Sequence, residues 1–100
     1  MSRMDRVDPQ KLVVIEAPVE IDVATAPSFR AQVLEVAADR TVVVDLTAVR
    51  FCDSSGLAAL IVAREHLGTG GGRLVLRNPT PPVCRLLEII HLEGVFDIEA

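Results

Sequence analysis

The sequence predicts a single α/β domain, in which three helices pack on a mixed, mostly parallel sheet of four or five strands. One observation is that short apolar segments alternate with longer segments of helical periodicity along the chain. A second is the segment TVVVDL at 41–46, a continuous run of apolar and β-branched residues that is typical of a parallel strand buried on both faces. Strand and helix units in this order imply right-handed crossovers, so we expect the helices to cover the sheet.

Length and composition fit one domain over residues 1–100, with no linker and no internal repeat. A chain of this size can form one core, and 50% of its residues are hydrophobic. Trp and Tyr are absent, and the three phenylalanines, Phe29, Phe51 and Phe96, are isolated from one another in the sequence. We therefore expect an aliphatic core.

The first half of the chain holds three expected strands and one helix. The segment KLVVIEA at 11–17 is a short apolar run that predicts a strand, and a ragged first strand near 4–8 is expected to pair with it. Thr25, followed by a proline in the first turn, marks the capped start of a helix over about 26–38. The buried strand at 41–46 comes next.

The second half repeats the alternation. Apolar residues at helical spacing predict a helix from about 55 to 67, which the glycine-rich segment GTGGG at 68–72 ends. A strand at 73–78 follows, then a helix built by the segment 79–94, and a last strand at 95–99. The glycine-rich segment leads from a helix into a strand and lacks the GK[ST] ending of a phosphate loop, so it is interpreted as a helix cap and turn.

Charge and cysteine spacing exclude several classes of function. A net charge of −4 does not favour binding to nucleic acid, which requires a basic surface. No apolar run approaches the roughly 18–20 residues that span a bilayer. Cys52 and Cys84, interpreted as small buried apolar residues, form no CxxC pair and no metal-ligand spacing with the histidines, and the opening MSRMDRVDPQ holds no apolar signal segment. We expect a cytoplasmic protein with reduced thiols and no metal or cofactor, whose partner is a protein or a small molecule.

Two serines at the start of the second helix raise the question of chemistry. Asp53, Ser54 and Ser55 stand in the segment CDSSG, which misses the nucleophile-elbow pattern G-x-S-x-G by one position. A catalytic triad needs a histidine beside the serine, but His66 lies roughly 18 Å further along the same helix. His91 ends the third helix, at the opposite edge of a parallel layer. We therefore expect no catalytic residue and no enzyme.

Two other readings of this turn stay open on these grounds. Any of the three side chains can accept hydrogen bonds from the free amides of the first helical turn, and capping needs only one of them. A phosphate on a serine here would face the positive end of the helix and add a charge of about −1.5 to −2. Such a site would act as a switch toward a docked partner.

The sequence resembles a known family, the STAS domain of bacterial anti-sigma factor antagonists. Three segments carry the likeness: VEIDVATAPSF at 19–29, VVVDLTAVRFCDSSGLAAL at 42–60, and GGRLVLRNPTPPVCRLLEIIHLEGVF at 71–96. The likeness spans roughly residues 11 to 98. The order Asp-Ser-Ser-Gly-Leu after a strand is its most specific part.

The resemblance implies a protein-binding switch. Members of this family bind an anti-sigma factor that is also an ATP-dependent serine kinase, so that the sigma factor is released. The kinase then phosphorylates the first serine of the pair, which corresponds to Ser54, the modified antagonist dissociates, and a serine phosphatase resets it. By the same resemblance, the residues that contact the partner around Ser54 are Asp22, Thr25, Asp53, Ser55, Gly56 and Leu57.

The layout of the chain leads to the same region independently. The loop at 19–25 and the turn at 52–56 each follow a strand and precede a helix, so both are expected at the carboxyl edge of the sheet, as neighbours. Gly56 either leaves room for a partner's active-site loop or eases the start of the helix. Leu57 offers an apolar contact, but it also fits the buried stripe of its helix.

Two departures from the family pattern affect the expected partners. Pro18 and Val19 replace a glycine that commonly precedes the Glu-Ile-Asp triplet, and the sequence ends at Ala100, where many relatives continue into a further helix. A less covered last strand makes a weak dimer an alternative to a monomer. The resemblance also permits another function, that of an adaptor subunit which binds a transporter or a stress-signalling scaffold without phosphorylation.

Overall fold

The structure of the chain is a computed structural model that describes residues 11–92 and 94–100. The strand expected near 4–8 lies outside these residues. In chain order the elements are β1 (Leu12–Glu16), β2 (Glu20–Ile21), α1 (Ala26–Leu34), β3 (Thr41–Asp45), β4 (Phe51–Cys52), α2 (Ser54–Thr69), β5 (Arg73–Arg77), α3 (Pro81–Ile89) and β6 (Asp97–Glu99). The predicted α/β class and the three helices are confirmed.

The strands form two separate groups. Four of them make a sheet in the order β1-β3-β5-β6, and β2 pairs with β4 in a short ribbon of its own. All pairings between the described strands are parallel, so the expected mixture of strand directions is not seen among them. The predicted four-stranded sheet is confirmed, whereas the separate β2–β4 ribbon was not predicted.

The central strand is the one that the sequence marked most clearly. In β3, Val43 pairs with Val14 of β1 on one side and with Val75 of β5 on the other. Val42, Val43, Val44 and the following Leu46 have no exposed surface, as expected for a strand covered on both faces.

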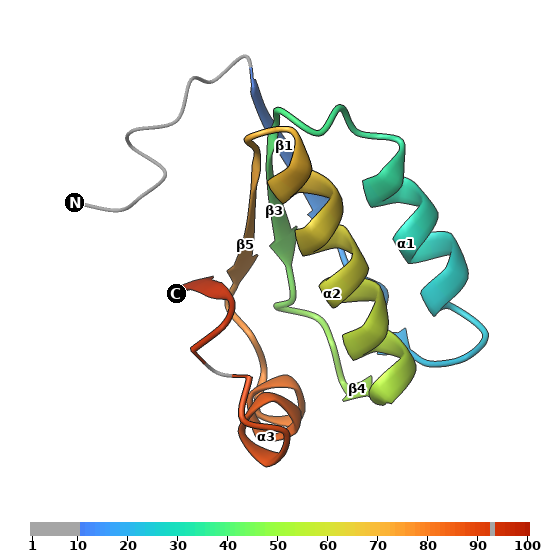
Figure 1. Cartoon of the computed structure of the whole chain (residues 1–100). Helices are drawn as coiled ribbons and strands as arrows, with labels where there is room; N and C mark the ends of the chain where they lie inside the picture. The colour runs from blue at the N-terminus through green and yellow to red at the C-terminus, as the bar shows by residue number, and fades with distance from the viewer. Residues whose placement is uncertain (1–10, 93) are drawn as a thin grey trace.

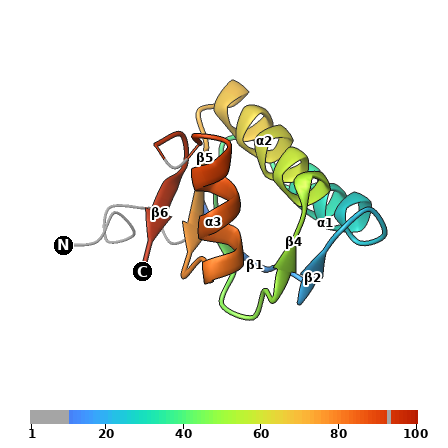
Figure 2. The same ribbon diagram turned by 90° about the horizontal axis from the view of Figure 1, so that it is seen from below.

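The helices cover the sheet unevenly. Helices α1 and α2 lie side by side on one face of the sheet and contact each other along their lengths (Figure 1). Helix α3 lies at the carboxyl end of the strands, where it contacts β4 (Figure 2). The core between these elements is aliphatic apart from Phe29 and Phe96, whereas Phe51 is half exposed. The expected aliphatic core is therefore confirmed.

Helix α1 is shorter than predicted. It ends at Leu34 instead of continuing to about residue 38, because the amide of Val36 donates to the carbonyl of Val33 at 3.0 Å and tightens the last turn. The chain then turns back to start β3 at Thr41. Val36 still packs against the core, which explains why the helical spacing of apolar residues extends past the true end of the helix.

Helix α2 is longer than predicted, from Ser54 to Thr69, and ends in the glycine-rich segment. Gly71 has a φ of +82°, in the region that favours glycine. A side chain at Gly72 would collide with the carbonyl oxygens of Ala38 and Arg40, and the amide of Gly72 donates to the Ala38 carbonyl at 3.0 Å. The segment is a helix end and turn, as predicted.

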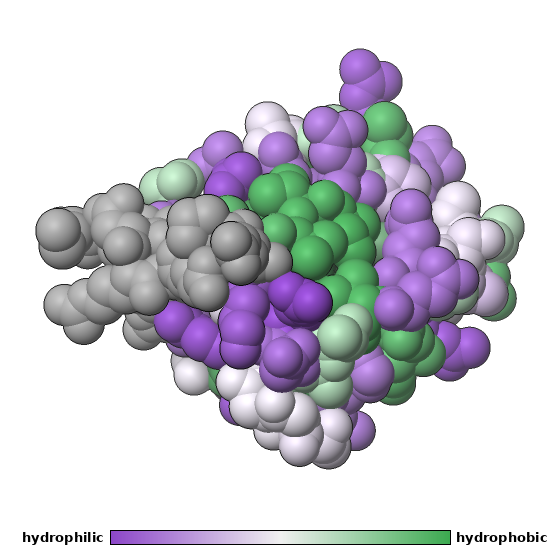
Figure 3. Space-filling view, turned by 90° about the horizontal axis from the view of Figure 1, so that it is seen from above, coloured by the Kyte–Doolittle hydropathy of each residue, from purple (hydrophilic) through white to green (hydrophobic). Residues whose placement is uncertain are grey.

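The opposite end of the molecule holds the amino ends of the strands. Among the described residues, polar side chains border a hydrophobic area on this face (Figure 3). Within the described part of the chain, no helix is long and apolar enough to cross a membrane, and no group of three or more potential metal ligands is found.

Candidate functional site

The β2–β4 ribbon brings the two predicted loops together. Ile21 pairs with Cys52, and the amide of Asp53 donates to the carbonyl of Ile21 at 3.1 Å. Asp22 and Asp53 therefore leave the ribbon at the same level, each into a turn that precedes a helix. The expectation that the loop at 19–25 and the turn at 52–56 are neighbours is confirmed.

Asp53 caps helix α2 with its side chain. Its Oδ1 atom accepts hydrogen bonds from the amides of Ser55 at 2.8 Å and Gly56 at 3.4 Å. The extended backbone of Asp53, with φ −105° and ψ −171°, is the conformation that this type of cap requires. Because one carboxylate satisfies these amides, neither serine hydroxyl is needed as a cap.

Ser54 is the first residue of helix α2, and its side chain is exposed. Its hydroxyl makes no hydrogen bond within the residues that the structure describes. Ser55 is half-buried and faces the space between α1 and α2. Of the two serines, Ser54 is thus the more exposed.

The neighbouring turn is held by Asp22 and Thr25. The Oδ1 atom of Asp22 accepts from the amides of Ala24 at 2.9 Å and Thr25 at 3.1 Å. The Thr25 hydroxyl donates to the carbonyl of Glu20 at 2.7 Å and accepts from the amide of Asp22 at 3.0 Å. The two side chains fix the shape of this loop.

The expected capping role of Thr25 is wrong in its detail. Thr25 occupies the cap position of α1, but its side chain makes no capping hydrogen bond. The reason is its helical backbone, with φ −99° and ψ −25°, which turns the hydroxyl back toward Glu20 instead of toward the first turn of the helix.

Gly56 is buried against the β2–β4 ribbon. An added Cβ atom would lie 2.6 Å from the Cys52 sulfur and 2.6 Å from Cγ2 of Ile21. Close packing therefore requires glycine here, a reason that neither of the two readings of the sequence included. Leu57 is also in the core, with 8% of its surface exposed. Gly56 and Leu57 therefore support the turn from the side of the core. The outer surface of the two neighbouring turns is formed by the other predicted site residues: Asp22, Thr25, Asp53, Ser54 and Ser55.

Cys52 lies under the same turn, and its thiol is neutral at physiological pH. Burial, with a smaller contribution from the charge of Asp53, raises the pKa of the Cys52 thiol to about 11. Cys52 and Cys84 are both free and half-buried, so the expectation of small buried residues holds only in part. A neutral thiol is a poor nucleophile.

Neither histidine is a hydrogen-bond partner of the serines among the described residues. His66 is at the other end of α2 from Ser54, with its Nε2 atom 2.9 Å from the carbonyl oxygen of Val36. His91 follows α3 in a left-handed conformation, with a φ of 58°. The expectation that it lies at the opposite edge of the sheet is wrong, because α3 packs at the carboxyl end of the strands, beside β4 (Figure 2). Among the described residues, neither serine has a histidine as a hydrogen-bond partner, so the arrangement does not support a catalytic triad.

Fold and site together define a class of protein: a small α/β domain that presents an exposed serine on an aspartate-capped turn. A family model described as the STAS domain matches residues 3–100. The chain belongs to the STAS domain family.

Two relatives extend this assignment. A STAS-domain containing protein of Pseudomonas aeruginosa is 37% identical over 59 residues, which cover 59% of this chain and 58% of that protein. The match therefore spans less than two thirds of that relative's length. The anti-sigma-B factor antagonist of Bacillus subtilis is 33% identical over 84 residues, which cover 81% of this chain and 75% of the relative.

Solved structures agree with the fold. An anti-sigma factor antagonist from Mycobacterium paratuberculosis matches with a TM-score of 0.74 and 33% identity, covering 92% of this chain and 80% of that one. The anti-sigma factor antagonist SpoIIAA, in its unphosphorylated form, matches with a TM-score of 0.76 and 26% identity over 90% of this chain and 80% of that one. A sulfate transporter family protein from Wolinella succinogenes shares the fold, with a TM-score of 0.77 at 16% identity over 98% of this chain and 84% of that one.

Proposed function

We propose that this protein is an anti-sigma factor antagonist that is switched by phosphorylation of Ser54. In this proposal it binds an anti-sigma factor that is also a serine kinase, so that the sigma factor is released. The observation that carries the proposal is the division of roles in the turn: Asp53 caps the helix, and the exposed hydroxyl of Ser54 is left for a partner. The similarity to the Bacillus subtilis antagonist over 81% of the chain supports it.

The chain contributes the acceptor, and the partner contributes the nucleotide. The Ser54 oxygen attacks the γ-phosphorus of ATP held by the kinase, the bond to the β–γ bridging oxygen breaks, and ADP leaves. The serine proton passes to a base of the kinase. This chain therefore needs no cofactor of its own, and its role is regulatory binding, not catalysis.

The new phosphate would weaken the complex through its charge. The amides of Ser55 and Gly56 already donate to Asp53, so a phosphate on Ser54 does not find these donors free. About −1.5 to −2 of charge is then added beside the carboxylate of Asp53 and near that of Asp22. Like charges that must be desolvated at an interface weaken binding. A serine phosphatase would restore the unmodified form.

The contact surface in this proposal is the outer part of the two turns. Asp22 and Thr25 shape one loop, Asp53 and Ser55 flank Ser54 in the other, and Gly56 and Leu57 hold the turn in place from the core side. A kinase loop that reaches Ser54 would also lie beside the turn of Asp22 and Thr25, because the β2–β4 ribbon sets the two turns side by side.

Phosphorylation by purified anti-sigma serine kinases tests the proposal. Wild type, Ser54→Ala and Ser55→Ala are incubated with each kinase and ATP, and any phosphate is located by mass spectrometry. We expect a phosphate on Ser54 in wild type and in Ser55→Ala, and none in Ser54→Ala. Phosphate on Ser55 alone, or none with any anti-sigma kinase, would contradict the proposal.

The second candidate is an adaptor subunit of a transporter or a stress-signalling scaffold that works without phosphorylation. This candidate is retained because a sulfate transporter family protein from Wolinella succinogenes has the same fold. Such an adaptor has no need of a reachable hydroxyl at the start of α2. Binding that is unaffected by charge at residue 54 would favour the adaptor.

A further inference from the structure

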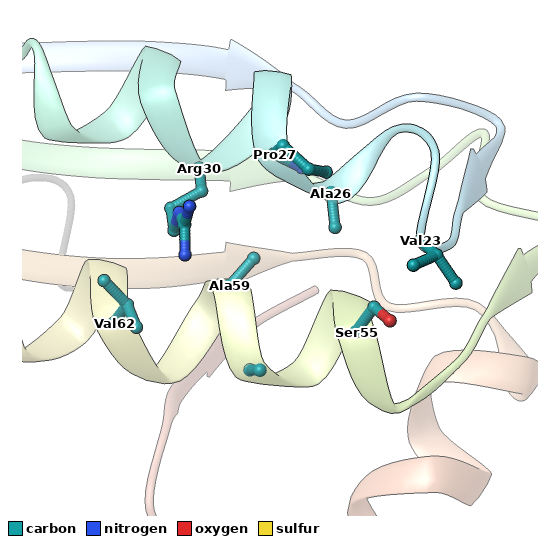
Figure 4. A pocket seen from close by; sticks show the side chains of 8 residues that line it. Val23, Ala26, Pro27, Arg30, Ser55, Ala59 and Val62 are labelled. Atoms are coloured by element: carbon teal, nitrogen blue, oxygen red, sulfur yellow. The ribbon is translucent and has the colours of Figure 1, made fainter.

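A groove runs between the first turns of helices α1 and α2. Its volume is about 280 Å³, larger than a 150 Å³ apolar cavity that accommodates a benzene molecule. The residues that line it include Val23, Ala26, Arg30, Ser55, Ala58 and Val62. Figure 4 labels five of these, Val23, Ala26, Arg30, Ser55 and Val62, around the space between the two helices. The groove is large enough for one apolar side chain of a partner.

The walls of the groove are apolar and accessible. Val23 stands at one end with 75% of its surface exposed, the highest value among the large hydrophobic residues that the structure describes. The small side chains of Ala26 and Ala58 leave the groove open, so a side chain of a partner can enter it. Val23 therefore extends the apolar surface of the groove at the end nearest to Asp22.

Arg30 gives the groove its polarity. Its side chain extends from α1 toward α2 (Figure 4), and no carboxylate of the described residues forms an ion pair with it. The guanidinium of Arg30 lines the groove and is complementary to a negative group on a partner. Guanidinium groups bind carboxylates well, often through two hydrogen bonds.

The groove is continuous with the turn around Ser54. Ser55 belongs to both, and Val23 directly follows Asp22 in the neighbouring loop. From Ser55 to Val62 helix α2 advances roughly 10 Å, or about two turns. A partner segment that reaches Ser54 can therefore extend into the groove without leaving the surface.

From this arrangement we infer that the α1–α2 groove receives an apolar side chain of the kinase that lies next to a carboxylate, and that Arg30 binds this carboxylate. The identity of the partner rests on the proposed function, whereas the chemistry of the groove does not. Such a contact would anchor the kinase beside Ser54 and would be independent of the phosphate.

The first test uses small molecules and needs no kinase. N-acetyl-leucine carries an apolar side chain next to a carboxylate, N-acetyl-leucinamide lacks the charge, and N-acetylglycine lacks the side chain. In an NMR titration we expect saturable shifts of the Val23, Arg30 and Ala58 amides with N-acetyl-leucine, at a Kd on the order of millimolar. The other two compounds should bind at least about tenfold more weakly.

Two charge-reversed variants control this titration. Arg30→Glu should abolish the shifts. Arg64→Glu should keep them, because Arg64 is also an exposed arginine, lies on α2 and does not line the groove. Equal binding of N-acetyl-leucinamide, or no saturable shift at the groove residues in wild type, would overturn the proposal.

The second test measures the affinity of the kinase identified by phosphorylation of Ser54. We expect Arg30→Glu and Ala58→Phe, which fills the groove, to lower it by at least about tenfold, with Arg64→Glu within about twofold of wild type. Wild-type affinity of both groove variants would overturn the inference while leaving the proposed function intact. If no anti-sigma kinase binds the wild type, the proposed function fails. The titration alone then tests whether the groove binds an apolar side chain next to a carboxylate.

Discussion

Asp22 and Asp53 lie at the same level of neighbouring turns, and each carboxylate accepts hydrogen bonds from two amides that follow it in its own turn. This arrangement follows from the parallel β2–β4 pairing, in which Ile21 and Cys52 are partners. Both turns are therefore shaped by an aspartate, and Ser54 projects from a surface that already carries two carboxylates.

Removing the cap at Asp53 should cost stability without changing the fold. We expect Asp53→Ala to lower the free energy of unfolding by about 0.5–2 kcal/mol, because the amides of Ser55 and Gly56 lose their acceptor. Asp53→Asn keeps an oxygen at the same place and should cost less. Urea denaturation followed by circular dichroism measures both variants; equal losses would show that the side-chain oxygen is not the source of the stability.

Two glycines of helix α2 should respond in opposite directions to alanine. Gly56→Ala forces a Cβ atom to within 2.6 Å of Cys52 and Ile21, so we expect a loss of stability of about 1–3 kcal/mol from overpacking. Gly68→Ala has open space around its Cβ atom and should gain about 0.5–1 kcal/mol from helix propensity. Thermal unfolding of the two variants checks this. A stabilised Gly56→Ala would disprove the packing argument.

Charge at residue 54 should control the complex with the kinase. We expect Ser54→Ala to bind as wild type does, and Ser54→Asp to bind about a hundredfold more weakly, which corresponds to roughly 2.7 kcal/mol. The reason is the repulsion and desolvation of a new carboxylate beside Asp53.

Calorimetry in the presence of nucleotide measures these affinities. Ser28→Asp is the matched control, because Ser28 is exposed on α1 and the substitution adds the same charge outside the turn. If Ser28→Asp weakens binding as much as Ser54→Asp, net charge and not position is responsible. Equal affinities of wild type, Ser54→Ala and Ser54→Asp would favour the adaptor function.

The Cys52 thiol should react slowly and with a steep pH dependence. Its pKa is raised to about 11, so near neutral pH its thiolate fraction is far below that of a free cysteine, whose pKa is about 8.5. We expect alkylation by iodoacetamide at least about tenfold slower than that of a free thiol at pH 7, with the rate rising until the pH approaches 11. The Cys84→Ser variant isolates the measurement. A rate that levels off near pH 8.5 would contradict the burial argument.

The raised pKa also sets the sign of a contribution to stability. Because the folded state favours the neutral thiol, its contribution is fully present below the pKa of the unfolded chain, about 8.5, and is lost as the pH rises toward the folded value of about 11. Comparing the Cys84→Ser variant with the double variant Cys52→Ala/Cys84→Ser across this window isolates the loss, which the second protein should lack.

Local patterns in the sequence determined much of this protein. The β-branched run at 41–46 identified the central strand, because a continuous apolar segment can be satisfied only where both faces are covered. The proline after Thr25 marked the start of α1. The segment Asp53-Ser54-Ser55 predicted a capped start of a helix in which not every polar side chain is needed for capping. The order Asp-Ser-Ser-Gly-Leu was also the most specific part of the family resemblance.

Only the tertiary structure decided which residue takes which role. Strands β2 and β4 have two residues each, too short for a periodic pattern, so their pairing could not be predicted. The need for glycine at position 56 depends on Ile21, far away in the sequence, and the groove at Arg30 exists only because α1 and α2 lie side by side. Hydrophobic periodicity encodes which side of an element is buried, but it does not encode what that side packs against, because those contacts join residues that are distant along the chain.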